Sequence, residues 1–122
     1  MIKEAYCSFE VAKLLKEKEF EGDILMFIDK DNVKYDYTLS GFISDETIPC
    51  PTHQMAMKWL REVHDLHIIA YPYKRGEDEK GWCCQVYKTY NLLGQERYTD
   101  ETLDSYEEAV EAALKYSLEK LI

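Results

Sequence analysis

The sequence has no apolar run approaching the ~20 residues that a membrane-spanning helix needs. Its first ten residues contain Glu4 and Glu10 and no long apolar stretch, which is unlike a secretory signal peptide. None of its four cysteines stands in a Cys-x-x-Cys pair, the spacing typical of a zinc or dithiol redox site. These absences predict a cytoplasmic protein that keeps its thiols reduced and does not associate with a membrane.

Glycine is scarce as well, with only five residues, so few positions allow a cofactor to approach the backbone closely. The sequence contains neither a Gly-rich phosphate-binding loop nor a G-x-S-x-G nucleophile motif. With 24 acidic residues and three histidines, many carboxylate and imidazole pairs are conceivable, but the spacing along the sequence singles out none of them as a catalytic pair. We therefore predict no enzymatic activity and no cofactor. A small enzyme is the alternative, and it would need polar groups that converge in a pocket.

Basic residues are outnumbered, with 15 against 24 acidic residues and a net charge of −9. A chain of this charge is repelled at long range by nucleic acid and by anionic membranes. The densest basic patches are residues 13–18 and the pair Lys74 and Arg75, and each patch lies beside acidic residues. The charge therefore disfavours a nucleic-acid partner. A basic face on the first helix is the alternative that would allow one.

The rest of the composition is that of a folded protein, with 46% hydrophobic and 32% charged residues in 122. A chain of this length can bury a core without disulfides, and we expect a single domain over residues 1–122. Ser8 is a suitable N-cap for a helix over residues 9–19, whose apolar side chains recur at helical spacing. Ser105 and Glu108 form a capping box that predicts a final helix with a broad apolar face.

A central helix is predicted to begin at Pro51 and Thr52, because a Thr oxygen can accept from the free N–H groups of a first turn. A row of apolar residues at helical spacing gives this helix its expected buried face. The row consists of Met55, Ala56, Trp59, Leu60 and Val63. After Asp65 the pattern changes directly to that of a strand.

Alternating residues predict two hairpins. The first covers residues 23–38, with a turn at residues 29–32, and its first strand is apolar on both faces and therefore central in a sheet. The second joins strands at residues 67–73 and 82–90 through a charged tip at residues 74–80. The order α-ββ-α-ββ-α predicts an α+β fold, with a mostly antiparallel sheet of about four strands and helices packed on it.

Several segments carry a resemblance to a known group of proteins. They are SFEVAKLLKEKEF, IPCPTHQMAMKWLREVHDLHI, the later YPYK with a following Trp, and SYEEAVEAALKYSLEKLI. Together they resemble a family of small uncharacterised proteins encoded by phages and prophages of gut bacteria. The resemblance implies a mobile-element origin and a cytoplasmic location inside an infected cell. It implies no activity, so no functional residue is carried over from it.

Histidine and cysteine at the two ends of the central helix are weak metal-ligand candidates. Cys50 and His53 stand at its start, and His64 and His67 stand at its end. These are suitable elements for zinc, but a helix of about twelve residues separates the two pairs by roughly 18 Å. The geometry therefore disfavours one shared metal site, and a two-ligand site would be weak. We predict no bound metal, and a metal-binding protein is kept as an alternative together with the small enzyme.

Aromatic residues supply the most suggestive pattern, because the sequence has ten tyrosines and many lie in or beside the predicted strands. Tyr and Trp are favoured at protein interfaces, although cross-strand pairs that stabilise the sheet explain the same residues. The candidate binding residues are Tyr71, Tyr73, Lys74, Arg75, Trp82 and Tyr87. We expect a protein that acts by binding another protein, including inhibition of a host protein; pairing of two copies is an alternative.

Overall fold

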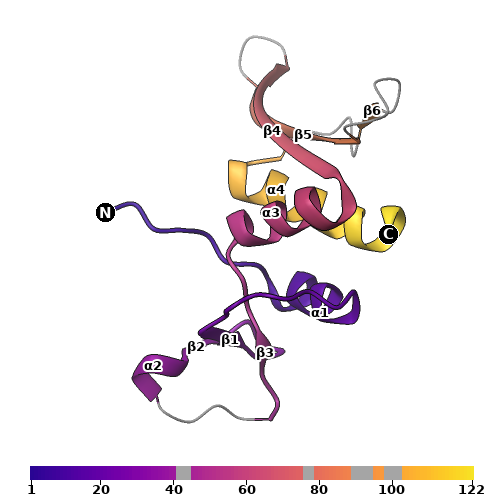
Figure 1. Ribbon diagram of the computed structural model, residues 1–122. Helices are drawn as coiled ribbons and strands as arrows, with labels where there is room; N and C mark the ends of the chain where they lie inside the picture. Colours follow the sequence, from indigo (N-terminus) through magenta and orange to yellow (C-terminus); the bar gives the residue numbers. More distant parts are fainter. Residues whose placement is uncertain (41–44, 76–78, 89–94, 98–102) are drawn as a thin grey trace. The chain divides into compact units, whose positions relative to one another are not determined.

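The computed structural model describes residues 1–40, 45–75, 79–88, 95–97 and 103–122 (Figure 1). The chain divides into two compact units, Met1–Ala56 and Met57–Ile122. The expectation that residues 1–122 form a single domain stays a prediction. No helix in the described ranges has the length and apolar composition to cross a bilayer.

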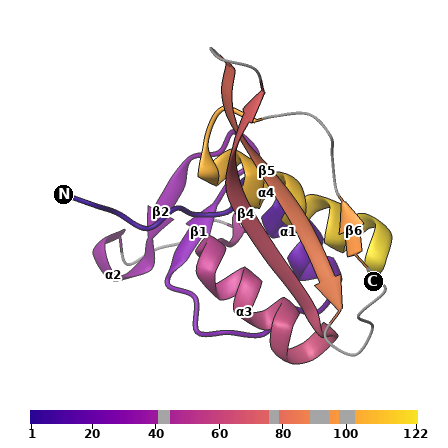
Figure 2. The same ribbon diagram turned by 90° about the horizontal axis from the view of Figure 1, so that it is seen from above.

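The predicted α+β fold is confirmed, since the structure combines helices with antiparallel sheets (Figures 1 and 2). The first unit holds α1 (Phe9–Glu17), β1 (Met26–Ile28), β2 (Lys34–Asp36), α2 (Tyr37–Ser40) and β3 (Ile48–Pro49). Helix α3 (His53–His64) begins in this unit and continues into the second. The second unit then has β4 (Leu66–Arg75), β5 (Glu79–Lys88), β6 (Gln95–Arg97), α4 (Tyr106–Tyr116) and the π-helix η1 (Ser117–Leu121).

The strands form two sheets, and this differs from the expected single sheet of about four strands. The sheets have the orders β2-β1-β3 and β4-β5-β6, and every pairing in them is antiparallel. Two of the strands had not been predicted. They are the two-residue β3 and the three-residue β6, which are too short to show a two-residue periodicity in sequence.

Helix α1 begins as predicted, because the Ser8 hydroxyl accepts a hydrogen bond from the Val11 N–H at 3.2 Å. It ends at Glu17, two residues before the predicted end. Glu19 adopts a left-handed backbone conformation with φ 64°, which a continuing helix cannot contain. The apolar face of α1 packs in the core of the first unit, where Ala12 lies with Ile28 and Cys50.

Helix α3 buries a different face from the predicted one. Its buried side chains are His53, Ala56, Met57, Trp59 and Leu60. Met55 and Val63, both expected to be buried, are 37% and 60% exposed. The buried face therefore lies further toward His53 and Met57, which complete an i, i+3, i+4, i+7 set with Ala56 and Leu60. His53 and Met57 were not part of the predicted apolar row, although both are buried.

Helix α4 covers one face of the second sheet, since it packs against both β4 and β5. Its cap is the predicted one in part: the Ser105 hydroxyl accepts from the Glu108 N–H at 3.1 Å. The Glu108 carboxylate accepts from the Asp104 N–H at 2.9 Å, one residue before the expected Ser105 donor. The two interactions satisfy backbone donors at the start of the helix.

The first hairpin turns at Asp29, as predicted. The Asp29 Oδ1 accepts from the N–H groups of Asp31 at 2.9 Å and Val33 at 3.0 Å, and Asn32 has the left-handed φ of 62°. The tip of the second hairpin at residues 76–78, the end of its returning strand at 89–90 and the expected turn at 91–94 lie outside the described residues.

We expect the first hairpin to weaken in acid. The Val33 N–H, with further donors at Tyr35 and Asp31, holds the pKa of Asp29 below its ordinary value. The ionised carboxylate therefore stabilises the folded state above about pH 4, and this contribution is lost as the pH falls through the lowered pKa. In urea unfolding, Asp29→Asn should be less stable than the wild type at pH 7, and the two should converge at pH 2. The neighbouring Asp31→Asn is the control; an Asp29→Asn deficit that stayed constant with pH would contradict this account.

We expect Ser117→Ala to be stabilising. The Ser117 side chain is 0% exposed, and no residue in the described ranges hydrogen bonds to its Oγ. An unsatisfied buried hydroxyl costs free energy, so its removal should raise the free energy of unfolding by about 1 kcal/mol. Ser105→Ala, which removes the α4 cap, should lower it by about 1 kcal/mol in the same denaturant titration. A destabilised Ser117→Ala protein would mean that the hydroxyl has a partner in solution.

Candidate functional site

The register of β4 and β5 distributes the predicted binding residues over two faces of one sheet. Residues paired directly across antiparallel strands lie on the same face. Tyr71 is paired with Cys83, Tyr73 with Gly81 and His67 with Tyr87, whereas Pro72 is paired with Trp82. The structure thus brings Tyr71, Tyr73 and Tyr87 together, with Arg75 at the next register position of that face. It places Lys74 and Trp82 on the opposite face.

The face that carries Trp82 belongs to the core of the second unit. Cys84 and Val86, two and four residues further along β5, are buried on it. The Trp82 ring meets the Tyr106 ring of α4 edge-on, with centroids 5.7 Å apart and an interplanar angle of 82°. Trp82 therefore has a structural role in attaching α4 to the sheet.

The opposite face, here called the outer face, carries the tyrosines of both strands. Its positions on β4 and β5 are His67, Ile69, Tyr71, Tyr73, Cys83, Gln85 and Tyr87. On β6, Gln95 and Arg97 stand at the same face, as the register partners of Tyr87 and Gln85. Ile69 is 49% and Tyr73 42% exposed, while Tyr71 and Tyr87 are half-buried. The Tyr87 hydroxyl donates to the Gln85 side chain, and His67 Nε2 lies 3.2 Å from Asp65 Oδ1.

A hollow of about 550 Å³ lies between the second hairpin and Asp104, the residue before the α4 cap. Its lining is Pro72, Tyr73, Lys74, Gly81, Trp82 and Asp104. Three of these, Tyr73, Lys74 and Trp82, had been predicted as binding residues. Gly81 was missed, although the signal was present: a glycine in a strand leaves space opposite its partner, here Tyr73.

The weak metal candidates each have a different neighbour. The Cys50 thiol donates to the Cys7 carbonyl at 3.2 Å, and His53 is buried in the first unit. The His64 ring lies against Trp59 with a centroid distance of 4.7 Å. The described residues contain no group of three or more His, Cys, Asp or Glu side chains placed to hold a metal ion.

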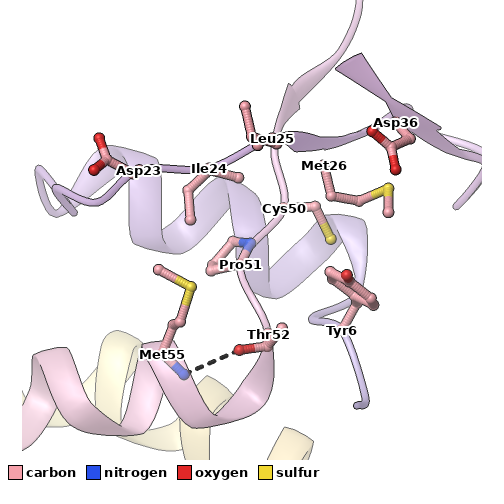
Figure 3. Close-up of a pocket in the computed structure, with 10 residues that line it drawn as sticks. All are labelled: Tyr6, Asp23, Ile24, Leu25, Met26, Asp36, Cys50, Pro51, Thr52 and Met55. Carbon is pink, nitrogen blue, oxygen red and sulfur yellow. Dashed lines mark hydrogen bonds between the residues drawn. The ribbon is translucent and has the colours of Figure 1, made fainter. Parts of the chain in front are cut away.

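A smaller cavity of about 200 Å³ lies in the first unit, and sequence reasoning missed it (Figure 3). It opens where one segment changes its pairing partner. The Cys50 N–H donates to the Met26 carbonyl at 2.8 Å, but one residue later the Pro51 carbonyl accepts from the Cys7 N–H at 3.0 Å. The chain therefore leaves β1 and pairs with the N-terminal segment, through the bridge between Tyr6 and Thr52.

The walls of this cavity are mostly apolar, and its charged residues are both acidic. Ile24, Met26, Pro51 and Met55 contribute apolar surface, and Asp23 and Asp36 contribute carboxylates. Asp36 is the cross-strand partner of Met26, which places both side chains on one face. In Figure 3 they lie at the end of the cavity nearest Tyr6, and Asp23 lies at the other end.

Comparison with known proteins adds no relative: no family model, no curated protein and no solved structure matches this chain. The resemblance to phage-encoded proteins therefore stays a prediction. The geometry of the outer face and of the two hollows is therefore the basis for a functional proposal.

We expect the four thiols to be unreactive in the folded protein. Cys7, Cys50, Cys83 and Cys84 are all free and buried, with exposures of 5% or less. Burial, and then the neighbouring Cys83, raise the pKa of the Cys84 thiol to about 11, so it is not the reactive thiolate at neutral pH. Ellman's reagent should detect essentially no thiol in the native protein at pH 8 and all four after unfolding in urea. Rapid labelling of even one native thiol would contradict the described packing.

Proposed function

We propose that this protein acts by binding another protein through the outer face of the second sheet. The observation that carries the proposal is that β4 has no charged residue on that face between His67 and Tyr73, and β5 has none between Cys83 and Tyr87. Beside them, β6 has Arg97 at the register position opposite Gln85. Charged residues make up 32% of the chain, so two paired strands without charge on one face over this length are distinctive. Depletion of charge and enrichment of Tyr are the compositional features of interface centres.

The side chains of the outer face are supported in a way that suits binding. Tyr71 stands opposite Cys83 and Tyr73 opposite Gly81, so both large rings are paired with small residues. The aromatic rings offer a large contact area for little loss of side-chain entropy. Ile69 lies two residues before Tyr71 on the same face and is 49% exposed, so it adds accessible apolar area beside the tyrosines.

The size of the outer face fits the centre of an interface and not its whole extent. A stable interface typically involves about 20–30 residues on each side, with a polar rim around an apolar centre. The seven outer-face positions of β4 and β5 supply such a centre. Charged residues that follow in the register, at Arg75 and Glu79, stand where the rim would begin.

The setting we propose is the cytoplasm of a bacterial cell that carries a phage or prophage, with the protein acting as an accessory factor or as an inhibitor of its partner. The support for this setting is the sequence resemblance alone. A second copy of the chain is the other occupant that the outer face would accept, and the experiment below separates the two.

We expect a photo-reactive side chain on the outer face to cross-link to the partner. Ile69→p-benzoylphenylalanine places the probe beside Tyr71 and Tyr73, and Val63→p-benzoylphenylalanine is the matched control because Val63 is 60% exposed on α3. After irradiation in bacterial cells, the Ile69 variant should give a discrete adduct that the Val63 variant lacks. Adding Tyr73→Ser should reduce the adduct about tenfold or more, as expected for loss of an aromatic anchor.

The mass of the adduct identifies the occupant of the outer face. A mass of two chains, together with concentration-dependent dimerisation in sedimentation velocity, would assign the surface to self-association. A heavier or lighter adduct would assign it to a different protein. Equal cross-linking from positions 63 and 69, or an Ile69 adduct that persists in Tyr73→Ser, would refute the proposal.

A further inference from the structure

We infer that the partner protein adds a strand to the second sheet, by pairing an extended segment with the open edge of β4 at residues 66–71. The inference rests on the proposed function, because it states how the partner of the outer face is held there. Two features carry it: the backbone groups of β4 that point away from β5, and the length and composition of β4 as an edge strand.

β4 is an edge strand of its sheet. The strand order is β4-β5-β6, so among the described strands only β5 pairs with β4 (Figure 2). In an antiparallel ladder, successive residues point their backbone groups alternately toward the neighbouring strand and away from it. Half of the N–H and C=O groups of β4 therefore face away from β5.

The hydrogen bonds of Trp82 show which residues of β4 face outward. The Trp82 N–H donates to the Leu103 carbonyl at 2.7 Å, and the Trp82 carbonyl accepts from the Leu103 N–H at 2.8 Å. Both backbone groups of Trp82 thus point away from β4, so Trp82 and Pro72 are a non-hydrogen-bonded pair of the ladder. By alternation, the backbone groups of Ile68, Ala70 and Pro72 face the open edge.

The position of Pro72 agrees with this assignment. A proline has no N–H, and within sheets it is confined to positions where no ladder bond is needed. At position 72 the missing donor would face the open edge, so the pairing with β5 loses nothing. Among the described residues, no backbone group outside the ladder hydrogen bonds to Ile68 or Ala70. An added strand can therefore bond to both of these residues.

The length of β4 distinguishes it from the other edge strands of the described sheets. Proteins protect open edges with very short strands, with charged residues or with proline. Strands β2, β3 and β6 have three, two and three residues, whereas β4 has ten. In β4, Pro72, Lys74 and Arg75 stand at one end, and residues 66–71 contain no proline and no Lys, Arg, Asp or Glu. This part of the edge has none of the usual protection.

An added strand would extend the outer face. The side chains of an edge strand and of a strand added to it alternate over the same two faces. Alternate residues of the partner segment would therefore lie beside Ile69 and Tyr71 on the outer face. They would cover Ile69, which is 49% exposed. In this mode of recognition, the backbone bonds supply affinity and the alternate side chains supply specificity.

The net charge favours a different protein over a second copy of the chain. Each chain has a net charge of −9, and self-repulsion of this kind keeps proteins monomeric. A segment of another protein does not meet this repulsion, and basic residues in it would be attracted. The occupant is therefore an extended segment of another protein, with apolar residues at alternate positions and Lys or Arg beside them.

The first test is amide hydrogen exchange of the ¹⁵N-labelled protein alone. The amides of Ile68 and Ala70 should exchange at least about a hundredfold faster than those of Ile69 and Tyr71, which face β5 and are bonded in the ladder. Equal protection of all four amides would overturn the inference, because the edge would then be covered within the chain itself.

The second test places proline on the open edge of the protein that carries p-benzoylphenylalanine at position 69. Ala70→Pro removes one outward N–H and keeps the bonds to β5, so we expect it to reduce the position-69 adduct about tenfold or more. If circular dichroism shows that Ala70→Pro does not fold, Ile68→Pro removes the other outward donor and should have the same effect. Full adduct yield in either folded variant would overturn the inference and leave the outer face as the binding surface.

Lys34→Pro is the matched control on the edge strand of the other sheet. The Tyr37 N–H donates to the Leu25 carbonyl at 2.9 Å and the Asp29 N–H to the Val33 carbonyl at 3.1 Å. The odd-numbered residues of β2 therefore face β1, and the Lys34 N–H points outward, as those of Ile68 and Ala70 do. Lys34→Pro should leave the adduct unchanged, and an equal loss in Lys34→Pro and Ala70→Pro would overturn the inference.

The third test uses a synthetic peptide of the segment to which position 69 cross-links. The peptide should slow exchange at Ile68 and Ala70 about tenfold or more. Of two versions N-methylated at alternate residues, in the two possible phases, one should keep this effect and the other should lose it, because only one set of peptide N–H groups faces β4. Unchanged exchange at saturating peptide, or equal effects of the two versions, would overturn the inference.

The adduct itself separates the inference from the proposed function. Absence of a specific adduct from position 69 in the protein without added proline would refute the proposed function, and the strand addition with it. A specific adduct that is insensitive to edge proline would refute only the strand addition. An adduct with the mass of two chains would also overturn the inference, since the occupant would then be a second copy.

Discussion

The antiparallel pairing of β4 with β5 is the constraint on which the second unit depends. Ten consecutive residue pairs run from Leu66 opposite Lys88 to Arg75 opposite Glu79. Because side chains alternate between faces, a slip of one residue would either move Tyr71 and Tyr73 to the face beneath α4 or bring Cys84 and Val86 to the surface. The apolar contacts with α4 therefore fix the register, and the register in turn places the tyrosines outside. Core packing and the proposed binding surface are two consequences of one pairing.

The first unit depends on a different device, the change of partner at residues 50–53. Segment β3 pairs with β1 as far as Cys50, and the following residues pair with Ala5–Cys7. Pro51 has no N–H to donate, and Thr52 caps α3 through its hydroxyl, so the sheet cannot continue along β1 at this point. The separation of the two segments leaves the cavity between Ile24, Pro51 and Met55. The cavity therefore results from the path of the backbone at residues 50–53 and not from a small side chain in its wall.

Elements with local signals were predictable. Ser8 and Ser105 mark the starts of α1 and α4, and the Asp29 to Asn32 turn follows from side chains that bond their own backbone. The buried face of α3 was predicted only in part, because His53 is buried there and Val63 is not. Strands β3 and β6 were missed because, at two and three residues, they are too short to show a periodicity. The candidate residues Tyr71, Tyr73 and Tyr87 do share a surface, but Trp82 was grouped with them although it belongs to the other face.

By itself, the sequence determined the α+β class, the three long helices, the two hairpins and the aromatic character of the second one. These features depend on side-chain spacing, capping and turn chemistry, which act over a few residues. The tertiary structure decided the division into two sheets, the choice of which tyrosines face outward and the existence of the acidic cavity. Each of these depends on the register between paired segments: Tyr71 with Cys83, Met26 with Asp36 and, far apart in sequence, Tyr6 with Thr52. Register is set by the sum of many long-range contacts, and no local pattern in a single sequence encodes that sum.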